Sequence, residues 1–500
     1  MESTGGAVMV NGNLAYKNDE QLKQDITIQN SPVKWCSVSL SDVVDRGKRL
    51  EASLFDVEAK QARETVLNNK YGITTLGGDN GIVLRAYYPG RFKRIYCSRI
   101  NGEAFFLPSQ MSDIYPKPDK WISALTKCDM NELRLKQNTL LLTRSGTIGN
   151  VSFVSRTLEN RVYSDDVIRV TFRNPVDLGY TYAYLKHKIG NIILTTNGYG
   201  AVITHLEPEH LAAIPIPNAP YLLRKQIHDL VVRSYALRDD SNDLIDEATH
   251  LLIHELHLPT ISDFEVEDYK KGAPVETYSV KLSDMSGRVD ASYHVPIVDA
   301  IIKHMRNYAA EVTTIGDERI SKDVILPGRF KRVYVEEGYG RVFIGGKQLW
   351  ELDPTNKKYL SLVHHGDRIA KQLELHENMT LITCSGTIGK VTLVGKHWEK
   401  WTANQHIIRI VPSSDDIAGY ISVFLSSEYG YPLITRYTYG SVVDEIDDNH
   451  VRSIAIPLLK NKDAQKKIND LALLANEKRY EAYQLEQQAL SIMNDKVLQA

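Results

Sequence analysis

The longest hydrophobic pattern of the chain runs from residue 221 to residue 256, and it contains neither glycine nor proline. Two columns of residues recur there every seven positions, namely Leu230, Leu237, Leu244 and Leu251 in one column and Ile227, Ser234, Ser241 and Ala248 in the other. Such a repeat predicts a long helix that packs closely along a second helix. At about 1.5 Å per residue, the stretch would reach roughly 54 Å, which suits a spacer. The alternative is an ordinary amphipathic helix within one domain.

A second copy of this pattern lies at the C-terminus, over residues 462–497. Its columns are Ile468, Ala475, Ala482 and Ala489, and Leu471, Lys478, Leu485 and Ile492. Ile468 follows Ile227 by 468 − 227 = 241 positions, and Leu471 follows Leu230 by the same 241. We therefore predict that the two helices pair with each other as an antiparallel coiled coil. The predicted seam consists of Ile227, Leu230, Leu237, Leu244, Leu251, Ile468, Leu471, Leu485 and Ile492.

The chain before the central helix contains segments with the alternating hydrophobic pattern of strands and segments with the pattern of helices. NTLLLTRSGTIGNVSFV predicts a strand, a glycine turn and a second strand, and DVIRVTF predicts another strand. The opening SVSLSDVVDRGKRLEASLFDVEAKQARE predicts a short strand and then a helix near residues 56–66. GYTYAYLKHKIGNIILTTN predicts one helix. Together these elements predict an α+β domain with local β-hairpins.

The region after the central helix repeats this order. PGRFKR occurs at Pro89 and again at Pro327, 238 positions later, and SGTIG occurs at Ser145 and again at Ser385, 240 positions later. Tyr-Gly pairs and IPIP-like closing segments recur at similar offsets. The sequence thus predicts a tandem duplication, in which each copy is an α+β domain followed by a long helix. The expected parts are a loose tail (1–30), a first domain (31–220), a spacer helix (221–258), a linker (259–276), a second domain (277–460) and a second spacer helix (461–500).

Composition narrows the class of protein only a little. The formal net charge is −2, so basic groups for a nucleic acid would have to gather on one face. The four cysteines show no CxxC spacing, which indicates reduced thiols rather than a zinc site or a disulfide framework. No signal peptide or apolar run of membrane length is evident, and we expect a cytoplasmic protein with no cofactor and no metal.

The combined motifs resemble the specificity subunit of type I restriction-modification systems. The resemblance rests on the RLEASLFD and RVDASYHV openings, the LLLTRSGTIG and LITCSGTIG turns, and the two closing segments that lead into the helices. It covers nearly the whole chain, from about residue 32 to residue 493. The extended N-terminus and the PGRFKR-bearing domains depart from common members, which leaves open a variant system such as a methylation-linked phage-defence operon.

The resemblance implies a function without catalysis. In that family, each globular domain reads one half of a split site in double-stranded DNA, and the paired helices set the gap between the half-sites. The helices also dock two DNA adenine methyltransferase subunits, and a separate motor-nuclease subunit can join. No methyltransferase, nuclease or P-loop motif was found in the chain. Two rivals stay open, namely a self-contained DNA enzyme with unrecognised motifs and a scaffold that never touches DNA.

The candidate phosphate contacts lie in the two PGRFKR copies. If these segments are strands, Arg91 and Lys93 share one face, and so do Phe92 and Arg94. Guanidinium and ammonium groups suit phosphate contact. The residues predicted to contact the DNA backbone here are Arg91, Lys93, Arg94, Arg329, Lys331 and Arg332. A solvated basic face, or arginines paired within their own domain, is the equally weighted alternative.

Other candidate DNA contacts are less specific. The SGTIG turns could offer backbone N–H groups to phosphate, but hairpins whose glycines adopt positive φ are the favoured interpretation. Arg144 precedes the first turn and Cys384 the second, so any direct role differs between the copies. Tyr199 and Tyr439 could reach a phosphate or pack in a domain corner. Sequence readout is expected between PGRFKR and SGTIG, within 110–134 and 345–372, with Gln110, Lys347 and Gln348 as candidates.

Overall fold

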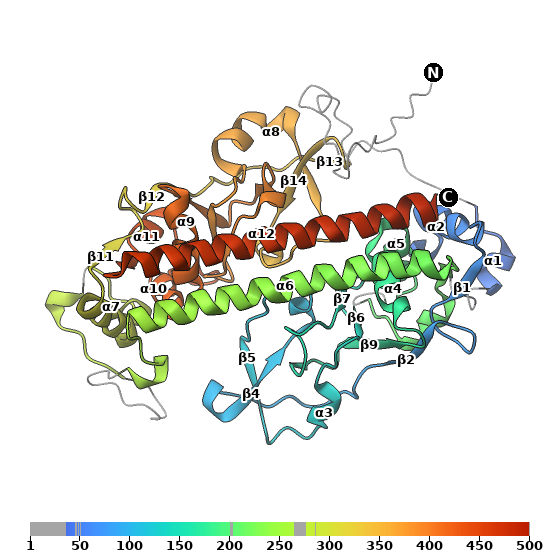
Figure 1. The fold of residues 1–500 in the computed structure, drawn as a ribbon, viewed down its shortest axis with the longest axis horizontal. Coiled ribbons are helices and arrows are strands. Elements are labelled where there is room, and N and C mark those ends of the chain that lie inside the picture. Colours follow the sequence, from blue (N-terminus) through green and yellow to red (C-terminus); the bar gives the residue numbers. More distant parts are fainter. Residues whose placement is uncertain are drawn as a thin grey trace.

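The computed structural model describes residues 37–45, 48, 50, 52–200, 204–264, 277–285 and 287–499. The predicted tail over 1–30 and most of the predicted linker over 259–276 lie outside this part of the chain. Two long helices, α6 (Tyr221–Glu255) and α12 (Lys462–Ile492), cross the molecule side by side. One α+β unit lies on either side of this helix pair (Figure 1). No helix among the described residues is long and apolar enough to cross a membrane.

The helices α6 and α12 run antiparallel, and small residues form their contact. The Ser234 hydroxyl donates to the Ala482 carbonyl at 2.7 Å, and the Lys467 ammonium lies 2.8 Å from Glu247 near the opposite end. The small-residue column is buried, with 1% exposure or less at Ser234, Ser241, Ala475 and Ala482. Small side chains let two helix backbones approach each other closely. The predicted side-by-side arrangement is therefore present, while a regular coiled coil in the strict sense stays a prediction.

The leucine column of the predicted seam has a different role. Leu230 packs against the core of the first unit and Leu251 against the core of the second. Both are only partly buried, as are Leu244, Leu471 and Leu485. Leu230 and Leu251 thus attach α6 to the globular units, and the small column lies in the contact between the helices.

The first unit contains two four-stranded sheets and a two-stranded ribbon. The strand order of one sheet is β2 (Val83–Tyr87), β9 (Val167–Phe172), β6 (Leu140–Thr143) and β7 (Val151–Phe153). The other sheet has the order β3 (Tyr96–Cys97), β5 (Lys120–Ser123), β4 (Gly102–Phe106) and β8 (Val162–Tyr163). The antiparallel ribbon pairs β1 (Ile73–Thr75) with β10 (Pro215–Pro217).

The second unit repeats this topology strand for strand. Its sheets have the orders β12 (Ser321–Ile325), β19 (Ile407–Pro412), β16 (Thr380–Thr383), β17 (Val391–Leu393), and β13 (Tyr334–Val335), β15 (Lys358–Ser361), β14 (Gly340–Ile344), β18 (Thr402–Ala403). The ribbon pairs β11 (Glu311–Thr314) with β20 (Ala455–Leu458). Even an irregularity recurs, because the register shifts between Val83 and Arg85 in β2 and between Ser321 and Asp323 in β12. The two units therefore share one fold.

Short helices complete the units, and two sequence-based predictions are wrong here. The first unit has α1 (Leu40–Asp45), α2 (Val57–Leu67), α3 (Met130–Leu133), α4 (Val176–Lys186) and α5 (Lys188–Thr196); the second has α7 (Pro296–Tyr308), α8 (Leu362–Arg368), α9 (Asp415–Ser426), α10 (Gly430–Thr435) and α11 (Asp448–Arg452). Residues 40–45, in the segment expected to begin with a strand, form α1. The helix expected over 179–197 is two helices, because His187 adopts extended backbone angles and caps α5 through its side chain.

Each globular unit is anchored to both long helices. The core of the first unit includes Ile227 and Val231 from α6, and also Ile492 and the following Val497 from the C-terminal end. The core of the second unit includes Leu252 from α6 and Ile468 and Ala472 from α12. Because each unit buries apolar side chains of both helices, the helix pair and the two units form one packed body.

Candidate functional site

The two PGRFKR segments connect one sheet of a unit to the other. They lie between β2 and β3 and between β12 and β13, and neither segment is a strand, which corrects the conditional placement on a strand. The expected alternation nevertheless holds. Arg91 and Lys93 are exposed, while Phe92 and Arg94 are half-buried. Arg329 and Lys331 are likewise exposed. We call Arg91 with Lys93 the basic pair of the first unit, and Arg329 with Lys331 the basic pair of the second.

An aromatic contact fixes each basic segment to its unit. Phe92 meets the Phe105 ring edge to face at a centroid distance of 6.4 Å, and Phe330 meets Phe343 in the same way at 6.4 Å. The second arginine of each segment lies over the same strand ring, with Arg332 at 5.5 Å from the Phe343 centroid. The half-buried phenylalanine thus turns the neighbouring Arg and Lys side chains toward solvent.

Arg94 and Arg332 face different partners. Arg94 donates to Asp165 at 2.6 Å and approaches Asp166 at 3.3 Å, so its charge is largely balanced within the unit. Burial lowers the pKa of Arg94, but the hydrogen bond and charge of Asp165 outweigh burial and raise it. At the equivalent place, Arg332 donates to the neutral amide of Gln405 at 2.8 Å. The second unit therefore keeps more positive charge at this position than the first.

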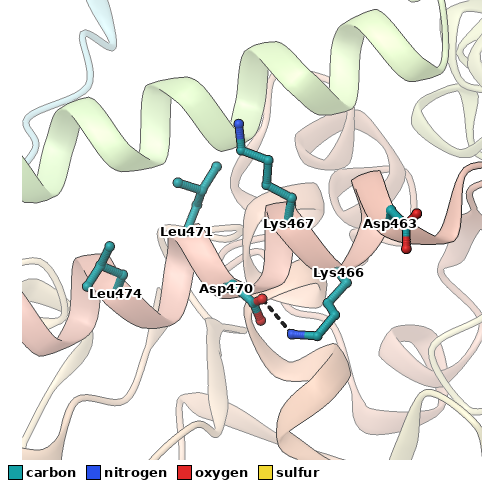
Figure 2. Close-up of a pocket in the computed structure, with 6 residues that line it drawn as sticks. All are labelled: Asp463, Lys466, Lys467, Asp470, Leu471 and Leu474. Carbon is teal, nitrogen blue, oxygen red and sulfur yellow. Dashed lines mark hydrogen bonds and ion pairs between the residues drawn. The ribbon is translucent and has the colours of Figure 1, made fainter.

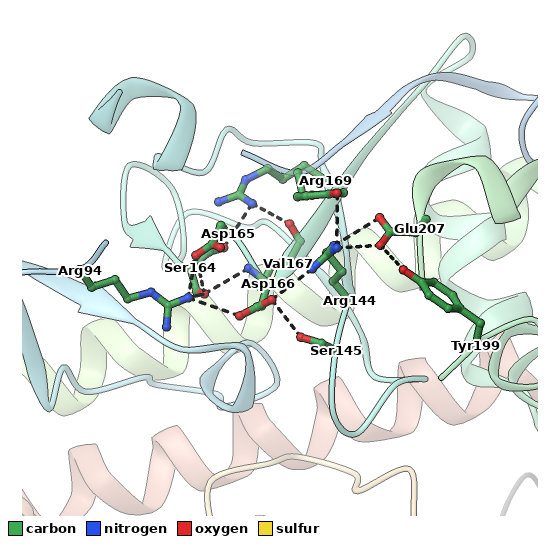
Figure 3. Close-up of polar contacts among 11 residues, drawn as sticks. Arg94, Arg144, Ser145, Ser164, Asp165, Asp166, Val167, Arg169, Tyr199 and Glu207 are labelled. Atoms are coloured by element: carbon green, nitrogen blue, oxygen red, sulfur yellow. Dashed lines mark hydrogen bonds and ion pairs between the residues drawn. The ribbon is translucent and has the colours of Figure 1, made fainter. Parts of the chain in front are cut away.

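Arg144 is the centre of a buried polar network in the first unit (Figure 3). The side chain is 5% exposed and donates to Glu207 at 2.6 Å, with Asp166 at 3.4 Å. The Tyr199 hydroxyl donates to the same Glu207 at 2.8 Å. Burial raises the pKa of Glu207, but the hydrogen bonds from Tyr199 and Arg144 outweigh burial and lower it. Arg144 and the Tyr199 hydroxyl thus hold a carboxylate inside the unit.

In the second unit, the site equivalent to the Arg144 network carries less charge. Cys384 stands at the position of Arg144 and is buried, which raises the pKa of its thiol to about 12. Arg329, whose side chain is 80% exposed, lies 3.2 Å from Glu445. Tyr439, which lies on the same loop as Glu445, is 42% exposed. Arg329 is therefore loosely paired and keeps most of its guanidinium in solvent.

The SGTIG turn and the Tyr-Gly loop meet in each unit. Ser145 and Tyr199 both form β-bridges with His205, and Ser385 and Tyr439 both form β-bridges with Glu445. The structure therefore joins motifs that are about 50 residues apart in the sequence. The ion pair of Arg329 with Glu445 brings the basic segment of the second unit to the place where its SGTIG turn and Tyr-Gly loop meet. One candidate surface in each unit thus combines the basic segment, the glycine turn and the Tyr-Gly loop.

The glycines of the SGTIG turn have backbone angles that other residues avoid. Gly146 and Gly386 have φ of +83° and +75°, and a Cβ at either position would meet nothing within 4 Å. The first glycine of each turn is therefore needed for its backbone conformation and not for space. This agrees with the structural interpretation of the motif.

Replacing Gly386 by alanine is expected to lower the free energy of unfolding by about 1–2 kcal/mol, because alanine is strained in the left-handed region. Gly366→Ala is the matched control, since Gly366 lies in α8 with open space around its Cβ position and no positive φ. It should stabilise the protein by up to about 1 kcal/mol. Urea unfolding of both variants makes the comparison. Equal stability of the two would contradict the conformational role.

The proposed base readers divide into two kinds. Gln110 is 8% exposed, accepts a hydrogen bond from Leu107 and donates to the Lys117 carbonyl at 2.7 Å. Gln348 makes the equivalent bonds, to Gly345 and to the Asn356 carbonyl. Both glutamines therefore brace their own loops, and their role as readers of bases stays a prediction. Lys347 is exposed and stays a candidate.

The helix pair offers a separate surface. A shallow pocket of about 320 Å³ lies on α12 and is lined by Asp463, Lys466, Lys467, Asp470, Leu471 and Leu474. Figure 2 shows Lys467 and Leu471 extending toward α6, and Leu474 farther along the helix. Leu474 is 42% exposed. Among the described residues, no group of three or more His, Cys, Asp and Glu side chains could hold a metal ion.

Comparison with protein families gives a match in the second half of the chain. Residues 354–471, from the residues before β15 into α12, match the family described as "Type I restriction modification DNA specificity domain". The second unit is therefore similar, over this stretch, to a DNA specificity domain. This match confirms the resemblance inferred from the sequence and the assignment of a recognition role rather than a catalytic one. The match does not extend to the first unit, whose relation to the specificity domain is its identical strand order.

Solved structures give weaker similarity. The S subunit of a type I restriction-modification system from M. genitalium is 13% identical with a TM-score of 0.32, and the alignment covers 86% of this chain and 96% of that one. The HsdS subunit from Thermoanaerobacter tengcongensis is 10% identical with a TM-score of 0.26, and the alignment covers 84% and 98%. TM-scores of this size do not establish a common fold. Comparison with curated proteins gives no match.

Several buried polar residues of the two units were not predicted from the sequence. Arg169 and Arg409 are at most 1% exposed and donate only to backbone carbonyls, including those of Leu133 and Leu373. Burial lowers their pKa to about 10 and about 9. An arginine at the same place in the apolar strands DVIRVTF and HIIRIVP was the available signal. The carboxylate Asp165 gave no such signal, because the second unit has Gln405 there, whereas Glu207 keeps an acidic counterpart in Asp447.

Proposed function

We propose that this protein is the DNA sequence-recognition subunit of a type I restriction-modification system or of a related methylation-linked defence complex. The observation that carries the proposal is the DNA specificity domain in the second unit, joined to a first unit with the same strand order. Two copies of one reading fold in one chain suit a bipartite site in double-stranded DNA. Each unit reads one half-site.

The basic pair of each unit contacts the phosphate backbone in this proposal. Arg91, Lys93, Arg329 and Lys331 are exposed, and each pair flanks a phenylalanine that fixes the segment. Charged side chains on phosphates position a protein on the duplex, while base edges specify the sequence. Lys347 and the exposed residues of 110–134 and 345–372 are the candidates for base contacts. Tyr199 and Tyr439 lie beside the same surface as further backbone contacts.

The helix pair acts as the spacer and as the docking surface for enzymes. An antiparallel coiled coil of α6 and α12 holds the units at a set distance, and its small-residue contact supports this role. The partners are two DNA adenine methyltransferase subunits, and a motor-nuclease subunit completes the restricting form of the complex. The place of action is the cytoplasm. In this proposal the chain recognises DNA, and catalysis belongs to the partner subunits.

The decisive experiment is co-expression of the chain with the adenine methyltransferase of its own system in a host without methylation, followed by sequencing of methylated bases. We expect one motif with two specified halves and a fixed gap. Exchange of residues 277–460 for the same block of a relative should change one half only. Methylation without a sequence motif would contradict the proposal. The purified chain alone should transfer no methyl group from labelled S-adenosylmethionine to DNA; turnover would indicate a self-contained enzyme.

A further inference from the structure

The two units touch each other directly, at the middle of the helix pair. Asp113 and Glu351 form an antiparallel β-bridge, and the Ile114 amide donates to the Trp350 carbonyl at 2.8 Å. Asp113 and Glu351 are 351 − 113 = 238 positions apart, which is the offset between the PGRFKR copies. Each carboxylate thus meets its own counterpart. The contact lies on the approximate twofold axis that relates the two units.

Each loop of this contact is also tied to a long helix. The Tyr115 hydroxyl donates to Asp246 of α6 at 2.5 Å, and Gln487 of α12 donates to Asp353 at 3.0 Å. These two bonds occupy equivalent places in the repeat, although their chemistry differs. The Ile114 carbonyl additionally accepts from Asn242 of α6 at 2.9 Å. The loops are therefore held both by each other and by the helices.

Apolar packing and cross-unit lysines complete the arrangement. Leu237 of α6, Ala482 of α12 and Leu352 form one buried cluster, against which Ile114 packs. Lys117 donates to the Ser426 carbonyl at the end of α9, and Lys186 at the end of α4 donates to the Asp353 carbonyl at 2.7 Å. The loop of each unit thus contacts the C-terminal end of a helix in the other unit, α9 or α4. We call residues 113–117 and 350–353 the clasp.

The helix pair and the clasp restrain different motions. Two helices in contact through serine and alanine, each anchored in both units, fix the separation of the units along the helix axis. The clasp joins the units off that axis and blocks rotation. On B-DNA, one base pair of gap changes the half-site separation by about 3.4 Å and its rotational phase by about 34°. Selection of a single gap therefore needs control of both quantities.

We propose that the clasp sets the rotational phase of the two reading units and so makes the protein strict for one gap length. This inference rests on the proposed bipartite DNA recognition. The residues that carry it are Asp113, Ile114, Trp350 and Glu351. They act by positioning the units and do not touch the bases.

The clasp also responds to pH. Burial raises the pKa of Asp113 to about 7, with Lys390 opposing this and Glu351 and Asp119 adding to it. Burial also raises the pKa of Glu351, where Lys186 and Lys390 oppose and Asp353 adds. Because the pKa of Asp113 is raised in the folded protein, the proton stabilises the clasp. As pH rises through about 7, Asp113 becomes a buried anion facing Glu351, and the clasp weakens.

The test compares DNA duplexes whose gap differs from the native gap by one or two base pairs, using the complex reconstituted with its methyltransferase. Ile114→Pro removes the amide that donates to Trp350. We expect the preference for the native gap to fall about three- to tenfold, the effect of one lost backbone hydrogen bond. Affinity for a single half-site should stay unchanged. An unchanged gap preference would overturn the inference while leaving the proposed function intact.

Two further variants keep the test independent of folding and of DNA. In wild type, the gap preference should weaken between pH 6 and pH 8.5, whereas Asp113→Asn should weaken less over this range, because its amide stays neutral and only Glu351 still titrates. Asp113→Cys with Glu351→Cys should form a disulfide, identified by peptide mass mapping, since directly bridged strand residues lie within disulfide range. Failure to cross-link would overturn the clasp itself. Cross-linking without any DNA binding would overturn the proposed function and, with it, this inference.

Discussion

A chain in which Arg91, Lys93, Arg329 and Lys331 are all alanine should bind its DNA on the order of 10²- to 10⁴-fold more weakly near physiological salt. These side chains are exposed, and a half-buried phenylalanine fixes each pair at the junction of two sheets. The slope of log affinity against log salt should flatten by roughly 3 to 4, because each lost phosphate contact removes about 0.9. Binding titrations at several salt concentrations measure both quantities.

The control is Lys60→Ala with Lys303→Ala, which removes exposed lysines from the outer helices α2 and α7. This variant should keep both affinity and slope. Alanine at Arg91 and Lys93 alone should flatten the slope by roughly 2. A lowered affinity with an unchanged slope would mean that these residues act through the fold and not on phosphate.

The second large effect concerns a buried ion pair between the long helices. Arg238 of α6 and Glu486 of α12 are 9% and 1% exposed and form an ion pair, and the Tyr182 hydroxyl of α4 donates to Glu486 at 2.9 Å. Glu486→Leu leaves the arginine buried without its carboxylate. We expect the free energy of unfolding to fall by about 3–5 kcal/mol, measured by urea unfolding of the chain.

Arg238→Met combined with Glu486→Leu provides the matched comparison. Replacing both charges by apolar groups of similar size removes the unpaired charge, so the double variant should recover most of the lost stability. A double variant as unstable as Glu486→Leu would show that packing volume, and not the uncompensated charge, dominates at this place. Binding of isolated half-sites should be unaffected in the double variant.

Exposure along the basic segments was predictable although the segments are not strands. Extended backbone places successive side chains on opposite sides whether or not it is paired in a sheet. The alternation of Arg91, Phe92, Lys93 and Arg94 therefore survived the wrong local assignment. What the pattern did not contain was the partner of Arg94, because Asp165 lies 71 residues away and only the fold brings it within 2.6 Å.

The long helices show a similar division. The seven-residue period marks which residues share a helix face, but it does not say what each face meets. Serine and alanine were predicted as a companion column, and in the structure they form the helix contact, while leucines of the predicted seam pack on the globular units.

By itself, the sequence determined the duplication, the two long helices, most strands and the recognition class, because periodicity and repeat offsets are properties of neighbouring or equivalent positions. Only the tertiary structure decided which polar groups are available. Gln110 turned inward to brace its loop, Arg144 became a buried holder of Glu207, and Asp113 met Glu351 across the twofold axis. These outcomes depend on contacts between segments far apart in the chain, and local sequence carries no record of such contacts.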